Sequence, residues 1–160
     1  MLNIRLAAAV AALALLGACS SDSTSQDAAA TGGGGAGAGA VRPGSQEDLV
    51  ANIGDRVFFA FDSSVIDADQ RPTLQRQAAW MQQYPSVTVT VEGHTDERGT
   101  REYNLALGQR RANAARDVLV AGGVAGARVA TISYGKDRPA ALGSDEAAWA
   151  QNRRAVTVVR

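Results

Sequence analysis

EGHTDERGTREYNLAL, residues 92–107, is the most informative stretch of this chain and continues as GQRRAN to residue 113. It places an acid, Asp96, directly after a predicted strand, and a base, Arg111, on the apolar stripe of the next predicted helix. A charge on an apolar stripe costs free energy unless a partner compensates it. An acid and a base in one cleft can hold a zwitterion, because the carboxylate binds an ammonium and the guanidinium binds a carboxylate. The stretch therefore predicts a binding pocket rather than a catalytic centre.

Two other interpretations of these residues stay open from the sequence. Asp96 and Arg111 can simply pair with each other and stabilise the fold. His94, the single histidine, can be a general base or a metal ligand, but the predicted domain has no second histidine and no cysteine to complete a metal set. We expect His94 to be a hydrogen-bonding strut, and we expect neither a catalytic residue nor a metal site.

Four strands are predicted around this stretch, because short segments rich in β-branched and aromatic residues recur along the chain. They lie at residues 56–61, 87–91, 129–134 and 154–159. The first helix is predicted to begin after an N-cap at Asp67, with Gln70 as capping-box partner and Pro72 in its first turn, and to end near residue 83.

The second helix is predicted over residues 101–121, where Gly122 and Gly123 end it. Residues 135–152 then form a long loop, with a helical turn near residues 145–150. The resulting order, β-α-β-α-β-β, predicts an α/β (α+β) two-layer sandwich. Right-handed crossovers place its two main helices on one face of a mixed four-stranded sheet.

The N-terminal residues have the pattern of an export signal. Arg5 precedes an apolar segment, residues 6–16, which is too short to span a bilayer and ends in LGAC, residues 16–19. Small residues before a cysteine resemble a bacterial lipobox, so residues 1–18 are predicted to be removed and Cys19 to carry N-acyl and S-diacylglycerol lipid. The alternative is an ordinary secretory signal with an incidental cysteine. Ser20 favours outer-membrane delivery by analogy with enterobacterial sorting.

The low-complexity segment after Cys19 buries almost nothing, so residues 19–45 are predicted to be a disordered tether rich in Gly, Ala and Ser. The domain then comprises residues 46–160. The formal net charge is +0, which gives no electrostatic argument for nucleic-acid binding. One cysteine allows no internal disulfide.

Several motifs in fixed order resemble one family. They are FDSS at 61–64, EGHTDERGT at 92–100, YN at 103–104, LG at 107–108, RRAN at 110–113, SYGK at 133–136 and NRRA at 152–155. Together they resemble the C-terminal domain of the outer-membrane protein A family over residues 56–159. GQRR at 108–111 and DEAA at 145–148 favour its branch of peptidoglycan-associated lipoproteins over the porin and flagellar-stator branches.

This resemblance implies non-covalent binding of peptidoglycan at the diaminopimelate of the stem peptide. It assigns the acid to Asp96, the arginine to Arg111 and two backbone amides to Phe61 and Asp62. Asn104 and Leu107 share the helix face with Arg111 and are expected to line the pocket, and we expect Arg153 to support it. These residues form the predicted peptidoglycan-binding site: Phe61, Asp62, Asp96, Asn104, Leu107 and Arg111.

The resemblance further implies an outer-membrane lipoprotein of the Tol–Pal system, with roles in envelope integrity and cell division. Its domain faces the periplasm, where the propeller protein TolB is an expected partner, and the lipid on Cys19 is its only attached group. Two alternatives remain. One is a related lipoprotein without a Tol role, and the other is a cell-wall hydrolase that uses Asp96 or His94.

Overall fold

The computed structural model describes residues 41–160. The predicted signal peptide, the lipidation site Cys19 and residues 19–40 of the predicted tether lie outside the described residues. Within residues 41–160, no helix combines the length and the apolar character needed to cross a bilayer.

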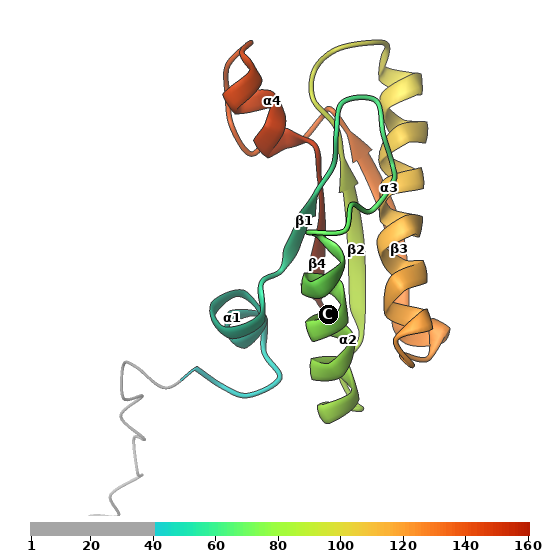
Figure 1. Ribbon diagram of the computed structural model, residues 1–160. Helices are drawn as coiled ribbons and strands as arrows, with labels where there is room; N and C mark the ends of the chain where they lie inside the picture. The colour runs from blue at the N-terminus through green and yellow to red at the C-terminus, as the bar shows by residue number, and fades with distance from the viewer. Residues whose placement is uncertain (1–40) are drawn as a thin grey trace, which may run out of the picture. The chain divides into compact units, whose positions relative to one another are not determined.

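One four-stranded sheet organises the domain (Figure 1). The strands are β1 (Arg56–Phe58), β2 (Val89–His94), β3 (Val129–Gly135) and β4 (Arg154–Val159). Their spatial order is β1-β4-β2-β3. β2 runs parallel to β3, whereas β4 runs antiparallel to both β1 and β2, so the sheet is mixed. This order places β2 in the interior of the sheet, and its last residue reaches the edge where the charged stretch begins.

Two long helices, α2 (Arg71–Gln83) and α3 (Arg101–Ala121), cover one face of the sheet. The core between the two layers is apolar. Its most deeply buried side chains are Val57, Val89 and Val91 from the strands, and Leu74, Met81, Ala112 and Leu119 from the helices. The predicted two-layer sandwich with two main helices on one face is therefore confirmed.

Short elements complete the described part of the chain. An N-terminal turn, α1 (Gln46–Asp48), continues into the π-helical turn η1 (Leu49–Ile53), a single 3-10 turn η2 (Gly126–Arg128) precedes β3, and α4 (Glu146–Asn152) precedes β4. The Asp145 side chain caps α4 by accepting a hydrogen bond from the Ala148 N–H at 2.8 Å. The helical turn predicted near residues 145–150 is thus a short helix.

The N-terminal turn is fastened to the core through a buried acid. The Asp48 carboxylate accepts a hydrogen bond from the indole Nε1 of Trp80 at 2.9 Å, and Trp80 is buried on α2. The Gln46 side chain accepts from the Val159 N–H at 2.7 Å. The chain therefore enters the domain beside the C-terminal end of β4.

Both ends of the second helix were predicted correctly, whereas the predicted start of the first helix was wrong. α3 begins after Thr100, whose hydroxyl accepts from the Tyr103 N–H at 3.2 Å, and it ends before Gly122. The capping box at the first helix is absent, because Gln70 Oε1 instead accepts from the Phe58 N–H at 3.0 Å and the helix begins at Arg71. Pro72 does lie in the first turn, as predicted.

The strand boundaries also shift toward the charged stretch. β1 ends at Phe58 rather than residue 61, because the chain leaves the sheet there to form a loop. β2 covers residues 89–94 instead of 87–91, since the Val87 carbonyl is taken by the Arg128 guanidinium at 2.7 Å and its N–H closes a turn onto Tyr84. The end of β2 is therefore closer to Asp96 than predicted.

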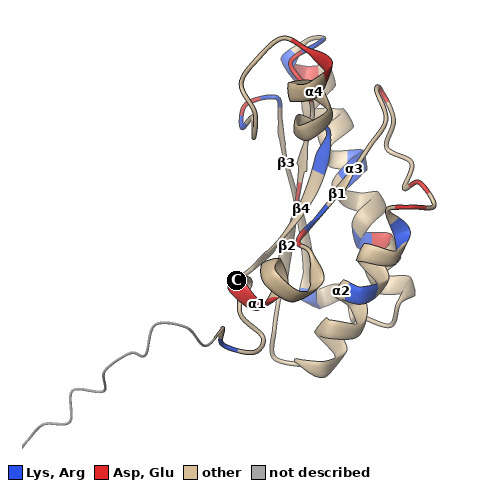
Figure 2. Ribbon diagram, turned by 60° about the vertical axis from the view of Figure 1, so that its left-hand side comes forward, with Lys and Arg blue, Asp and Glu red and all other residues tan. Residues whose placement is uncertain are grey.

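Charged residues of both signs are interspersed along the helices and loops, as Figure 2 shows. This distribution agrees with the formal net charge of +0. Acids and bases both occur on α3, whereas the charged residues of α2 are Arg71 and Arg76 only.

α3 crosses β2 at a contact between two glycines. A Cβ atom added to Gly93 would lie 1.8 Å from the Gly108 carbonyl oxygen, so no side chain fits between the two backbones. Arg111 follows Gly108 by one helical turn. The close contact therefore fixes the height of Arg111 above the end of β2.

We predict that Gly93→Ala lowers the free energy of unfolding by about 3 kcal/mol or more, because the methyl group would force α3 away from the sheet. Gly126→Ala is the matched control, since the atom nearest to its added Cβ is the end of the flexible Arg116 side chain at 3.2 Å. Urea denaturation of both variants measures the difference. Equal stability of the two variants would show that the backbones separate at little cost.

Candidate functional site

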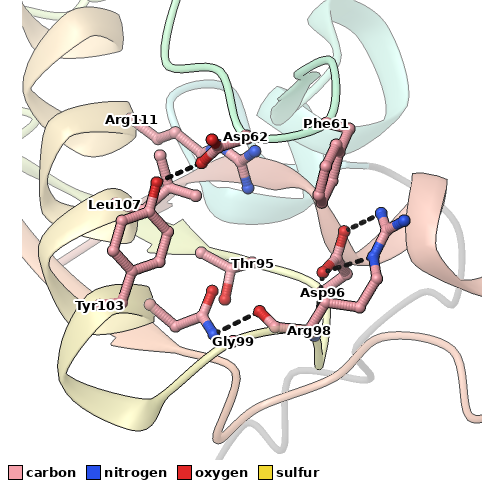
Figure 3. A pocket seen from close by; sticks show the side chains of 10 residues that line it. Phe61, Asp62, Thr95, Asp96, Arg98, Gly99, Tyr103, Leu107 and Arg111 are labelled. Atoms are coloured by element: carbon pink, nitrogen blue, oxygen red, sulfur yellow. Dashed lines mark hydrogen bonds and ion pairs between the residues drawn. The ribbon is translucent and has the colours of Figure 1, made fainter.

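A cavity of about 160 Å³ opens beyond the end of β2, between the first turns of α3 and the loop after β1 (Figure 3). All six predicted site residues line it: Phe61, Asp62, Asp96, Asn104, Leu107 and Arg111. The remaining lining residues are Thr95, Arg98, Gly99 and Tyr103. The structure thus brings together a set that is spread over fifty residues of sequence on three separate segments.

Arg111 is fully buried, and backbone carbonyls hold its guanidinium. Its Nε donates to the Ser63 carbonyl at 2.7 Å, Nη1 to the His94 carbonyl at 2.8 Å and Nη2 to the Ala60 carbonyl at 3.1 Å. These bonds tie the loop after β1 to the end of β2. An arginine has five N–H donors, so two remain that no hydrogen bond of residues 41–160 uses.

The charge of Arg111 is retained at neutral pH. Burial lowers the pKa of its guanidinium to about 10, although the nearby Asp96 charge opposes this shift. A pKa of about 10 still leaves the group protonated at pH 7. No ion pair within residues 41–160 joins Arg111 to a carboxylate, so its positive charge is available to a ligand.

Asp96 is buried as well, but its partners are arginines other than Arg111. Arg98 Nη2 donates to Oδ2 at 2.6 Å, Arg98 Nε donates to Oδ1 at 3.2 Å, and Arg153 Nη1 lies 3.6 Å from Oδ2. Burial alone would raise the pKa of this carboxyl, but the hydrogen bonds and charge of Arg98, aided by the charge of Arg153, hold it below its ordinary value. The alternative that Asp96 and Arg111 simply pair with each other is therefore wrong.

Arg98 is one of the cavity-lining residues that the sequence reasoning missed. Its guanidinium contacts two aromatic rings, with its central carbon 3.9 Å from the Phe61 centroid and 4.0 Å from the Trp149 centroid. Trp149 belongs to α4 and donates its indole N–H to Glu97 at 3.1 Å. Arg98 lies in a loop, where no hydrophobic periodicity points to it. The one available signal in the sequence was its position two residues after Asp96.

Arg153 lies next to Asp96, which is consistent with the supporting role expected for it. Its Nε donates to the Phe59 carbonyl at 3.0 Å and its Nη2 to Glu146 at 2.6 Å. Its Nη1 is buried and has no hydrogen-bond partner among residues 41–160. Arg153 is not among the cavity-lining residues, so it positions Asp96 from behind.

Besides Arg111, three residues of α3 line the helix side of the cavity. Tyr103 donates its hydroxyl to Asp62, a residue in the left-handed region with φ of 52°. Asn104 donates its side-chain amide to the Arg98 carbonyl at 2.8 Å and the Thr100 carbonyl at 3.0 Å. Leu107 is buried and apolar. These contacts fix both loops that bound the cavity.

Thr95 adds an unexpected polar group. Thr95 lines the cavity and is 3% exposed, and its hydroxyl oxygen is buried without a hydrogen-bond partner among residues 41–160. Figure 3 shows its side chain between those of Asp96 and Leu107. A buried hydroxyl in this position can both donate to and accept from a ligand.

His94 lies outside the cavity, and the role predicted for its ring is wrong. Both ring nitrogens are buried and make no hydrogen bond with the described residues, although Nε2 lies 3.6 Å from Glu92 Oε2; the ring centroid lies 5.6 Å from that of Tyr134. Burial, and secondly the charge of Arg154, lower its pKa to about 4. The group of His94 that does make a structural hydrogen bond is its backbone carbonyl, which accepts a hydrogen bond from Arg111.

The described residues contain no cluster of three or more His, Cys, Asp or Glu suited to a metal ion.

A comparison with protein-family models matches residues 58–153 to the OmpA family. The chain belongs to the OmpA family. The match includes all six predicted site residues, and it confirms the resemblance inferred from the motifs.

Several curated relatives carry the name peptidoglycan-associated lipoprotein. The chain is 60% identical to one from Rhizobium meliloti over 121 residues, which cover 76% of this chain and 69% of the relative. It is 62% identical to one from Mesorhizobium japonicum over 121 residues, or 76% of this chain and 72% of the relative.

Solved structures agree with these relatives. The crystal structure of the peptidoglycan-associated lipoprotein from Burkholderia pseudomallei has a TM-score of 0.66 and 43% identity, covering 71% of this chain and 100% of that one. The C-terminal domain of Helicobacter pylori MotB has a TM-score of 0.62 and 26% identity, covering 66% of this chain and 84% of that one.

We predict that Arg111→Ala lowers the free energy of unfolding by about 3–5 kcal/mol, because it leaves three carbonyls of the cavity wall without their donor. The neighbouring Arg110 is exposed, so Arg110→Ala is the control and should change stability by less than about 0.5 kcal/mol. Urea denaturation measures both. A small effect of Arg111→Ala would mean that water replaces the guanidinium at these carbonyls.

We predict that His94 makes the domain less stable as the pH falls from about 6.5 to 4. The native state keeps the ring neutral down to a pKa of about 4, whereas the unfolded chain protonates it near its ordinary value of 6.5. Unfolding therefore takes up a proton in this window, which costs up to about 3 kcal/mol of stability.

His94→Phe retains an aromatic ring against Tyr134 and removes the titrating group. Its unfolding free energy should fall less steeply than that of the parent protein over the same pH range. Denaturation at pH 7, 6, 5 and 4 gives the two slopes. Parallel slopes would assign the pH dependence to the carboxylates instead.

Proposed function

We propose that this chain is an outer-membrane lipoprotein that binds peptidoglycan non-covalently through the diaminopimelate of the stem peptide. One observation carries the proposal: a buried acid and a buried base, Asp96 and Arg111, border one cavity without pairing with each other. Such a pair suits a ligand that presents an ammonium and a carboxylate on one carbon. The free end of meso-diaminopimelate is a group of this kind.

Each wall of the cavity has a part in this binding. The two unused N–H donors of Arg111 suit the ligand carboxylate, since a guanidinium binds carboxylates bidentately. Asp96 suits the ammonium. Leu107 offers an apolar surface for the methylene chain, the Thr95 hydroxyl is free to hydrogen bond, and the loop containing Phe61 and Asp62 supplies backbone amides.

The lipid anchor and the domain would together join two layers of the envelope. Acylation at Cys19 holds the outer membrane, and a flexible tether of about 25 residues spans about 30 Å on average. The domain then reaches the cell wall on the periplasmic side. The names of the curated relatives support this arrangement, since they describe lipoproteins associated with peptidoglycan.

The proposal includes membership of the Tol–Pal system, with TolB as a protein partner and roles in envelope integrity and cell division. This part rests on the resemblance to the peptidoglycan-associated branch of the family. We assign no catalytic role to the domain: His94, one candidate base, lies outside the cavity, and both oxygens of Asp96 are engaged by arginines.

We predict that the lipid-free chain, residues 20–160, sediments with purified sacculi containing diaminopimelate, whereas Asp96→Asn and Arg111→Lys stay largely in solution. Asp96→Asn removes the negative charge of the site, and the loss of a buried charged partner costs about 2–5 kcal/mol, or about 30-fold to several thousand-fold in affinity. Arg111→Lys keeps the positive charge but loses the bidentate geometry and the guanidinium hydrogen bonds to the Ser63, His94 and Ala60 carbonyls.

The exposed ion pair Arg101–Asp137 provides matched controls. Its atoms approach to 2.7 Å outside the cavity, so Arg101→Lys and Asp137→Asn should sediment like the parent protein. Circular dichroism checks that every variant is folded. If Asp96→Asn still sediments fully, the acid is structural and binding occurs elsewhere. If the parent protein stays in solution, peptidoglycan is not the ligand.

A further inference from the structure

The ammonium position of the proposed site is already filled by a side chain of the protein. Arg98 reaches back over two residues and engages both carboxylate oxygens of Asp96, at 2.6 Å through Nη2 and 3.2 Å through Nε. The Arg98 backbone N–H adds a third bond to Oδ1 at 3.1 Å. Figure 3 shows this pair on the side of the cavity opposite Arg111.

Aromatic rings from two separate elements hold Arg98 in this place. The centroid of Phe61, in the loop after β1, lies 3.9 Å from the guanidinium carbon, and that of Trp149, on α4, lies 4.0 Å from it. Arginine stacks well on aromatic faces because the delocalised cation is weakly hydrated. The Arg98 side chain is nevertheless 31% exposed, so it can leave toward solvent without crossing the core.

The Asp96 carboxylate would not lose all support if Arg98 moved away. Arg153 Nη1 is buried, lies 3.6 Å from Asp96 Oδ2 and has no hydrogen-bond partner among the described residues. It is placed to keep the acid charged and oriented. The site is therefore built with one fixed cation behind the acid and one movable cation in front of it.

We propose that Arg98 is a specificity residue that competes with the ligand for Asp96. A simple amine gains little by displacing it, because one cation replaces another at the same carboxylate. A ligand that also brings a carboxylate to Arg111 gains a second charged interaction, and this gain displaces Arg98. The competition thus rejects a lysine side chain and admits diaminopimelate, and this inference rests on the proposed function.

The test compares two tripeptides, L-Ala-D-Glu-meso-diaminopimelate and L-Ala-D-Glu-L-Lys, binding to the parent chain, to Arg98→Gln and to Arg101→Gln. Arg101→Gln removes an arginine that pairs with Asp137 outside the cavity. Calorimetry should show at least tenfold tighter binding of the lysine peptide to Arg98→Gln than to the parent protein. The preference for diaminopimelate should fall at least fivefold, while Arg101→Gln matches the parent protein.

Trp149 provides a second readout, because departure of Arg98 removes a cation from its ring. Saturation with the diaminopimelate peptide should change the tryptophan emission of the parent protein, and Trp149→Phe should abolish that change. Binding without any change in emission, or an unaltered preference in Arg98→Gln, overturns the inference and leaves the proposed function intact. If neither peptide binds to the parent protein or to Arg98→Gln, both proposals fail.

Discussion

The contact between Gly93 and Gly108 sets the distance between α3 and the middle of the sheet, and the site depends on that distance. With any side chain at either position, the helix would have to stand farther from β2. The guanidinium of Arg111, one turn farther along the helix, would then no longer reach the carbonyls of His94 and Ser63. Two glycines thus determine where the guanidinium of Arg111, the most deeply buried arginine of residues 41–160, can lie.

The burial of Arg111 is tolerable because carbonyl dipoles, rather than a carboxylate, surround it. Three carbonyl oxygens satisfy much of its hydrogen-bonding capacity and leave its net charge uncancelled. Asp96 is compensated differently, by one stacked and one buried arginine. The two charges are therefore kept apart at the cost of using further charged side chains, and a charged ligand can interact with both.

Most of the fold could be predicted from the sequence, because its long helices and strands have clear hydrophobic periodicity and residues that typically end a helix. α3 spans Arg101–Ala121 as predicted and ends before Gly122, and local hydrogen bonds decide both of its ends, including the cap by Thr100 that was not predicted. The start of α2 was wrong because Gln70 bonds to Phe58, which is close in space but twelve positions away in sequence. Tertiary contacts of this kind leave no local pattern.

In the site, too, some residues could be predicted from local sequence and others depend on tertiary contacts. Its six predicted residues line one cavity, because strand ends and helix faces follow from periodicity together with the family motifs. Arg98 and Thr95 were missed, because their roles arise from tertiary packing. Arg98 contacts two aromatic rings from remote segments, and the hydroxyl of Thr95 is buried without a hydrogen-bond partner among residues 41–160. The ring nitrogens of His94 also make no hydrogen bond because of tertiary packing, since the ring packs against Tyr134 of β3.

The chain enters the domain at one end of the strands, and the cavity lies at the other. Gln46 is bonded to Val159, which is opposite Val89 at the start of β2, while the cavity begins just beyond His94 (Figure 1). Tension between an anchored N-terminus and a bound ligand would therefore run lengthwise along β2 and β4. Hydrogen bonds between antiparallel strands lie perpendicular to that direction, so they would be loaded together in shear instead of being unzipped one at a time.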